Sequence, residues 1–205
     1  MGVRAYEGAD LRAVADLYQR AVPTSTLGRL GPDAVARFLD HQLRLDGVEG
    51  FVVGPPGRPI GALVGGRFGR GTSEFVRAHA GFLALQVVRH PTVLAHAGAV
   101  VAVRVGAGSL LRPRRGPERP DRVPAGSYGV LVLAVDPDHQ GRGLGRALLE
   151  AAEGSARTQG FRALHLTVNP TLDASLRFYL GQGLHRLDPP GDAPRAWLMG
   201  KDLQL

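Results

Sequence analysis

The sequence predicts one α/β domain in which a mixed, mostly antiparallel sheet is flanked by helices. Short apolar stretches bounded by Gly and Pro are typical of strands, and they recur from one end of the chain to the other. Between them, apolar residues repeat at the three- and four-residue spacing of helices. The 205 residues are enough for one domain with a substantial core, and we expect residues 1–205 to form that domain.

The N-terminal part of the chain predicts a strand, two helices and a hairpin. Residues 3–6 are expected to form the strand, and Asp10 can cap the helix that follows it. Pro32 lies near the first turn of the second helix, where its missing N–H costs nothing. The apolar stretches 51–53 and 60–64 flank a turn rich in Gly and Pro, so we expect them to pair as a hairpin.

The middle of the chain predicts helices followed by an irregular basic segment. Apolar residues from Phe75 to Val87 repeat at helical spacing, and Pro91 begins a second helical pattern. Residues 112–122 combine several Arg residues with prolines, which disfavour regular structure and indicate a loop or semi-rigid linker. This segment is either a solvated excursion or an electropositive rim that attracts phosphates or an acidic substrate.

The C-terminal part predicts a return to alternating strands and helices. Residues 164–169 alternate like a strand that Pro170 closes, and residues 173–183 have the pattern of a short helix. Two last strands are expected at 185–187 and 195–199.

Composition narrows the classes of function. Although the net charge is +7, 24 of the 25 basic residues are Arg and most are scattered singly, so we expect no nucleic-acid partner. The absence of Cys excludes a disulfide framework, a thiolate metal site and a Cys acyl-enzyme, and we expect no metal. The N-terminus lacks a signal-peptide pattern, and the longest apolar stretch is far shorter than the ~20 residues of a membrane span. A cytoplasmic protein without a membrane partner is the resulting expectation.

The most informative segment runs from Val130 to Leu149. A continuous apolar run ends at Asp136-Pro137, a turn with alternating glycines occupies 140–145, and a helical pattern follows. In such a strand–turn–helix unit, main-chain N–H groups converge and the helix dipole favours negative charge. Glycines let a phosphate reach the backbone. The segment therefore predicts a ligand that carries phosphate.

Two common phosphate loops do not fit this turn. A P-loop needs Lys and then Ser or Thr after its last glycine, but Arg146-Ala147 follows Gly145. A dinucleotide fingerprint that starts at Gly141 would need glycine at its sixth position, which is Arg146. The remaining pattern, Gln-x-x-Gly-x-Gly with Gly143 and Gly145 as its glycines, resembles the coenzyme A pyrophosphate loop of the GNAT superfamily of N-acetyltransferases.

A second segment resembles a later motif of the same superfamily, in which a helix carries Tyr four residues before a Gly. Tyr179, Gly183 and the apolar Leu184 match that spacing. Two positions depart from the motif: the family often has Asn and Ala where this chain has Leu172 and Ser175. Asn169 lies nearby and could supply the polar contact instead. The resemblance is strong over residues 127–185 and architectural before them.

The resemblance implies a GNAT-like fold in which the fourth and fifth strands splay apart and admit the coenzyme. In the basic plan the third strand leads almost directly into the fourth, whereas here residues 65–126 intervene. We interpret the part from about 70 to 126 as a helical insertion with the Arg- and Pro-rich loop, not as a second domain. It could pack as core, cover part of the acceptor groove or form a homodimer contact.

The implied activity is transfer of an acetyl group from acetyl-CoA to an amine by direct attack in a ternary complex. A small-molecule amine is the leading acceptor, and a protein or peptide is the second. A non-catalytic acyl-CoA-binding protein is the alternative from another class. By this resemblance, strand N–H groups hold the pantetheine and thioester, and the turn holds the pyrophosphate. The residues expected to bind the coenzyme are Leu133, Ala134, Val135, Gln140, Gly141, Arg142, Gly143, Leu144, Gly145, Arg146, Asn169 and Ser175.

Tyr179 is the expected catalytic acid, which first donates a hydrogen bond to the leaving thiolate. The general base is not evident, because residues 127–135 contain no acidic side chain. Glu74, His79 and His165 are the candidates, with His165 also open to an ordinary, partly buried role. A low acceptor pKa or a water relay would make a side-chain base unnecessary.

Overall fold

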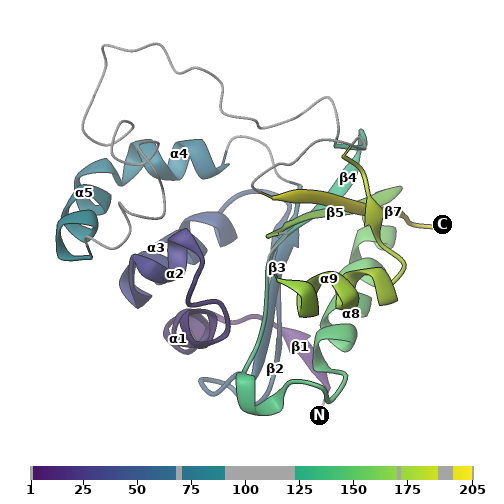
Figure 1. Ribbon diagram of the computed structural model, residues 1–205, viewed down its shortest axis with the longest axis horizontal. Coiled ribbons are helices and arrows are strands. Elements are labelled where there is room, and N and C mark those ends of the chain that lie inside the picture. The colour runs from purple at the N-terminus through teal and green to yellow at the C-terminus, as the bar shows by residue number, and fades with distance from the viewer. Residues whose placement is uncertain (1, 68–70, 91–122, 170–171, 189–195, 205) are drawn as a thin grey trace.

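A computed structural model of the chain describes residues 2–67, 71–90, 123–169, 172–188 and 196–204. These residues form a seven-stranded sheet with helices on both faces (Figure 1). The strand order is β1-β2-β3-β4-β5-β7-β6, and the pair β4–β5 is parallel while the other pairs are antiparallel. The predicted fold class, a mixed and mostly antiparallel sheet flanked by helices, is confirmed.

The strands follow the apolar stretches of the sequence, and the predicted hairpin is present as the antiparallel pair β2–β3. The strands are β1 (Val3–Ala5), β2 (Val48–Val53), β3 (Gly61–Gly66), β4 (Ser127–Val135), β5 (Ala163–Val168), β6 (His185–Arg186) and β7 (Trp197–Asp202).

Most helices begin and end near the predicted positions. The helices are α1 (Leu11–Ala21), α2 (Thr26–Arg29), α3 (Pro32–Leu43), α4 (Gly71–Ala78), α5 (Ala80–Arg89), α8 (Leu144–Thr158) and α9 (Asp173–Gly181), with 3-10 turns at Gly8–Asp10 and Pro137–His139. The short α2 was not predicted. It forms because Ser25 caps it: the N–H of Gly28 donates to the Ser25 hydroxyl oxygen at 2.9 Å.

Two cores fill the space between the sheet and its helices. We call the side of the sheet that α1 and α3 cover the α1 face, and the side that α8 and α9 cover the α8 face (Figure 1). Val35 of α3 packs with Val132 on the α1 face, and both are buried. Leu148 of α8 packs with Leu164 on the α8 face, and neither has any exposed surface. The sheet therefore separates two layers, and β2, β3 and β4 send side chains into both.

Asp10 has a different role from the predicted helix cap. Its carboxylate accepts two hydrogen bonds of 2.8 Å from the Arg4 guanidinium, and one of 3.0 Å from each of the N–H groups of Glu7 and Gly57. It makes no side-chain cap bond to α1. The carboxylate is fully buried and joins β1 to the turn between β2 and β3. Hydrogen bonding to Arg4 is the main reason that the pKa of Asp10 is lowered to about 2.

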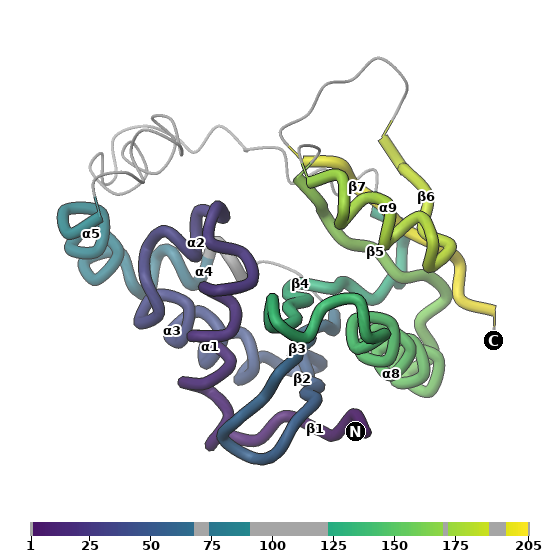
Figure 2. Tube along the Cα trace, turned by 60° about the horizontal axis from the view of Figure 1, so that its bottom comes forward, coloured from purple at the N-terminus to yellow at the C-terminus, as the bar shows by residue number. Residues whose placement is uncertain are grey.

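The inserted helices α4 and α5 pack mainly on α3, and Leu131 of β4 also packs against their apolar residues (Figures 1 and 2). The rings of Phe75 of α4 and Phe38 of α3 pack edge to face with their centroids 5.2 Å apart, and Leu83 of α5 joins the same small core. The predicted helical pattern of 75–87 is confirmed, with a break at His79 between the two helices. The helix expected from Pro91 and the basic segment 112–122 lie outside the described residues, as do the turn at 189–192 and the predicted start of the last strand.

Candidate functional site

β4 and β5 pair over only part of their lengths. Parallel pairing begins at Ser127–Ala163 and ends at Val130–Leu166, although β4 continues to Val135 and β5 to Val168. On its other side β4 skips one residue: Val64 pairs with Val132 and Gly65 with Val130. Leu131 is thus the extra residue of a β-bulge, which bends a strand and increases its twist. We call the space beyond the last β4–β5 pair the β4–β5 gap, and the predicted splay is present.

The direction of the β4 amides determines which of them face the β4–β5 gap. The N–H of Asp136 donates to the Ile60 carbonyl at 2.9 Å, so the next residue but one, Ala134, also faces β3. The N–H groups of Leu133 and Val135 therefore point into the gap, where no described strand pairs with them. Ala134 does not contribute as predicted, because its amide faces β3 and its side chain lies in the core of the α1 face.

The turn after β4 presents further donors. Gly141 and Gly143 have φ values of 74° and 77°, a left-handed conformation that favours glycine. Gly143 is the N-cap of α8, and the first helical bond runs from the N–H of Ala147 to its carbonyl at 3.0 Å. The three preceding amides of α8 have no acceptor within the helix, and no side chain caps this end. Free amides at a helix N-terminus, together with the helix dipole, favour an anion at such a position.

A cavity of about 290 Å³ lies where these donors meet α9. We call it the loop cavity, and its lining residues are Leu133, Val135, His139, Gln140, Gly141, Leu144, Gly145, Ala174, Ser175, Phe178 and Tyr179. The cavity thus brings together most of the predicted coenzyme-binding residues and the predicted acid. Its walls come from two motifs that lie about 35 residues apart in the sequence.

Several predicted residues do not line the loop cavity. Arg142 is exposed and donates to the Asp138 carbonyl at 3.2 Å, while Arg146 is exposed and donates to the Gln182 side chain at 3.3 Å. Gly143 lies outside the lining, although its backbone conformation shapes the turn. Asn169, an exposed residue directly after β5, also lies outside the lining.

His139, Ala174 and Phe178 line the cavity but were not predicted to do so. Phe178 lies beside Gly145, and this contact gave no signal in the sequence because it joins two helices. His139 was detectable, since it lies between the end of the strand and Gln140.

Hydrogen bonds hold the turn to α1 and to the end of β4. Asp136 accepts a hydrogen bond of 2.9 Å from Arg20 of α1 and another of 3.1 Å from the N–H of Asp138. The bond from Arg20 is the main cause that lowers the pKa of Asp136 below its usual value. The Gln140 amide nitrogen donates to the Val135 carbonyl at 3.2 Å, which covers an acceptor at the edge of the β4–β5 gap.

Comparison with known proteins assigns this arrangement to a family. Residues 32–184 match the acetyltransferase (GNAT) family. The chain belongs to that family. A mycothiol acetyltransferase from Nocardiopsis dassonvillei is 40% identical over 73 residues, which cover 32% of this chain and 22% of that protein. This chain therefore matches about a fifth of that relative's length.

Solved GNAT structures share the fold across nearly the whole chain. The ribosomal-protein-S18-alanine N-acetyltransferase from Escherichia coli superposes with a TM-score of 0.57 at 17% identity, covering 99% of this chain and 94% of that one. The PaiA N-acetyltransferase from Thermoplasma acidophilum, crystallised in complex with coenzyme A, gives 0.58 at 12% identity, covering 98% and 99%. At these identities the likeness establishes the fold alone.

In this GNAT chain, Tyr179 combines exposure to the loop cavity with burial in the core. It packs against the core of the α8 face, and its ring centroid lies 5.1 Å from that of Phe178 in an edge-to-face arrangement. Burial raises the pKa of Tyr179 to about 12. The phenol therefore stays protonated throughout the physiological pH range and can donate a hydrogen bond into the cavity.

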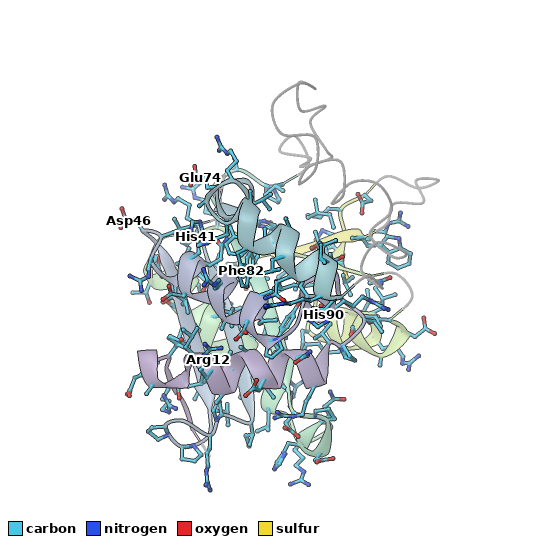
Figure 3. The ribbon with its side chains drawn as sticks, turned by 90° about the vertical axis from the view of Figure 1, so that its left-hand side faces the viewer. Arg12, His41, Asp46, Glu74, Phe82 and His90 are labelled. Carbon is cyan, nitrogen blue, oxygen red and sulfur yellow. The ribbon has the colours of Figure 1, made fainter. Side chains whose placement is uncertain are left out.

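The three candidate bases lie in different places. Glu74 is exposed on α4 (Figure 3), and the His79 ring lies 4.9 Å from that of Phe75, so neither lines the loop cavity. His165 is half-buried on β5, with its Nδ1 at 2.8 Å from the Ser127 hydroxyl oxygen. Burial lowers the pKa of His165 below its ordinary value.

No helix within the described ranges is both long and apolar enough to cross a membrane. Within the same ranges, no three His, Asp or Glu side chains lie together as a metal site requires.

Proposed function

We propose that this chain is an N-acetyltransferase that moves an acetyl group from acetyl-CoA to the amine of a small-molecule acceptor. The loop cavity carries this proposal, because strand-edge amides, an uncapped helix N-terminus and a tyrosine hydroxyl converge on it. These are the donors that a pyrophosphate, a pantetheine amide and a leaving thiolate require.

The residues of the cavity fit coenzyme A. The amides of Leu144, Gly145 and Arg146 would hold the pyrophosphate, since phosphates bind readily at helix N-termini. The amide of Val135 would bind the pantetheine arm as a neighbouring strand would, and the amide of Leu133 faces the same gap. The shared fold with a GNAT protein crystallised with coenzyme A supports this assignment.

The reaction would proceed by direct attack. The lone pair of the acceptor nitrogen forms the C–N bond, the C–S bond breaks, and the sulfur keeps the electron pair. A strand amide such as that of Leu133 would stabilise the developing oxyanion, an interaction typically worth ~3 kcal/mol. The acceptor ammonium loses two protons in all: one ends on the sulfur of the released thiol, and the other goes to solvent.

Tyr179 would assist the leaving sulfur chiefly by hydrogen bonding. With its pKa raised to about 12 and a thiol pKa of ~8.5, complete transfer of the phenolic proton is uphill by about 5 kcal/mol. The hydroxyl therefore donates to the thiolate while the proton that finally rests on sulfur comes from the acceptor ammonium.

We prefer a small-molecule acceptor because the relative that matches 73 residues of this chain is a mycothiol acetyltransferase. Calorimetric titration with acetyl-CoA, with pantetheine, NADH and ATP as controls, tests the donor site first. A panel of small amines and of peptides with free N-termini then reports acceptor class through release of free thiol. Thiol release with peptides alone would make the chain a peptide acetyltransferase. Binding without any amine-dependent release would leave an acyl-CoA-binding protein, and absent binding would overturn the donor assignment.

A further inference from the structure

The contact between Ser127 and His165 lies outside the lining of the loop cavity. Ser127 is at the start of β4 and His165 is in the middle of β5, and the Ser127 Oγ lies 2.8 Å from the His165 Nδ1. Ser127 is buried, whereas the His165 ring keeps some exposed surface. One ring nitrogen is thus fixed inside the sheet, and the ring orientation is set by it.

His165 lies on the sheet face opposite the loop cavity. Its neighbours Leu164 and Leu166 both point into the core of the α8 face. Because side chains alternate along a strand, His165 points to the α1 face. The loop cavity is lined by α8 and α9, which cover the α8 face. A group transferred through the β4–β5 gap would therefore have Tyr179 on one side and His165 on the other.

His165 also lies at the closed end of the β4–β5 gap. It pairs with Gly129 on β4, and Val130–Leu166, one residue further on, is the last pair before the strands part. On β7 its partner is Gly200. Both strand neighbours of His165 therefore lack side chains, and the imidazole lies on this face beside the gap, with the exposed Thr167 two residues further along β5.

We infer that His165, positioned by Ser127, takes the proton from the acceptor amine on the α1 face through bound water. Water is needed because His165 pairs with Gly129, whereas Leu133, whose amide is expected to hold the oxyanion, is four residues further along β4. This inference rests on the proposed acetyltransferase function. A neutral imidazole has one N–H and one lone pair. If the His165 Nδ1–H donates to the Ser127 hydroxyl oxygen, the lone pair is on Nε2. Through this water, His165 Nε2 then accepts one proton from the ammonium, the freed nitrogen lone pair attacks, and the imidazolium returns the proton to solvent.

The surroundings keep His165 in the form that this step needs. Burial lowers its pKa, so the ring is neutral at physiological pH. On the same face, the neighbouring strands contribute Asp202 of β7, beside Ala163, and His185 of β6, beside Gly200, as titratable groups. Both are exposed, and β4 contributes none. Burial is the cause of the lowered pKa, so the imidazole titrates below the ordinary range of ~6.5.

The position of the ring proton tests the inference directly. NMR spectra of the nitrogen-labelled full chain, saturated with acetyl-CoA, report which imidazole nitrogen of His165 is protonated. We expect the neutral ring to carry its proton on Nδ1. Ser127→Ala should shift the proton toward Nε2, and Ser127→Thr should restore it to Nδ1. A neutral wild-type ring protonated on Nε2 would overturn the inference, because that nitrogen then has no lone pair.

Kinetics provide the second test, with the panel amine that releases thiol fastest. His165→Gln should lower kcat/KM about 10²-fold, as expected for loss of a general base, and should abolish the fall in kcat/KM at acidic pH. The matched control His185→Gln changes an exposed residue of the same face. It should keep the wild-type kcat/KM and its fall at acidic pH. A His165→Gln enzyme that keeps the wild-type pH profile would refute the role of His165.

Calorimetry with acetyl-CoA on the same variants separates this inference from the proposed function. His165→Gln should bind acetyl-CoA with the wild-type affinity, because its side chain lies on the other face. If the wild-type chain itself fails to bind acetyl-CoA, the proposed function fails. If it binds and turns over while His165→Gln is equally active, only the assignment of the base fails.

Discussion

The Cα of Gly145 faces the ring of Phe178: a Cβ built on Gly145 would lie 3.3 Å from the ring carbon Cζ. This approach joins the first turn of α8 to α9, and both residues line the loop cavity. Gly145 thus has two reasons to be glycine, close packing of two helices and access of a ligand to the backbone. The glycine turn and the Tyr motif are parts of one structural unit.

Gly145→Asp should weaken acetyl-CoA binding at least 10-fold, which corresponds to about 1.4 kcal/mol. The new side chain would displace Phe178 and place a negative charge among the amides expected to hold the pyrophosphate. Calorimetric titration measures the change. Gly154→Asp is the matched control, because Gly154 is an exposed glycine of the same helix with open space around it. Equal affinity for the two variants would place the phosphates elsewhere.

Gly143→Ala should lower the free energy of unfolding by about 1 kcal/mol, because φ is 77° there and an alanine in that conformation is strained. Gly154→Ala, in the middle of α8, should raise it by up to about 1 kcal/mol, since alanine is the better helix former. Urea denaturation of the two variants measures these two changes in the free energy of unfolding, which should have opposite signs. A Gly143→Ala protein as stable as wild type would mean that the turn relaxes into another conformation.

Tyr179→Phe should lower kcat by about 10²-fold and leave the Kd for acetyl-CoA nearly unchanged. The loss should be uniform from pH 6 to pH 9, because the pKa of Tyr179 is about 12 and the hydroxyl stays protonated over that range. Tyr18→Phe, at a partly buried tyrosine of α1, is the control for loss of a phenol elsewhere. Full activity of Tyr179→Phe at every pH would remove this residue from the mechanism.

Asp10→Asn should destabilise the fold by about 2 kcal/mol at neutral pH, the value of a pKa shift from 3.8 to about 2. Because the folded pKa is lowered, this stability is fully present above pH 3.8 and is lost as the pH falls through about 2. Thermal unfolding should therefore show the largest difference from wild type above pH 5 and a smaller one near pH 2. The exposed Asp16→Asn should show no such trend. If the difference in stability between Asp10→Asn and wild type is the same at every pH, the effect of Asp10 is due to packing.

Local patterns predicted the elements well because they depend on spacing within a segment. The glycine turn, the helix of Tyr179 and the β2–β3 hairpin all follow from residues close in the sequence. Features that depend on pairing between distant segments were not accessible. Ala134 was assigned to the coenzyme because the sequence does not show which β4 amides face β3. That direction depends on the register between the two strands. The contact of Ser127 with His165 and the contact of Asp10 with Arg4 and Gly57 likewise require the folded sheet.

Leu131 is a surplus residue in its strand. Six residues of β3, Gly61–Gly66, face seven of β4, and the unmatched one is Leu131. Before it the even-numbered side chains Tyr128 and Val130 face α8, and after it the odd-numbered Leu133 and Val135 do. Removal of this single residue would restore regular alternation and leave every other side chain on its present face. We therefore expect deletion of Leu131 to produce a more regular sheet in which β4 pairs with β5 over more of its length. The β4–β5 gap would then be narrower, and the regular sheet would bind acetyl-CoA less well.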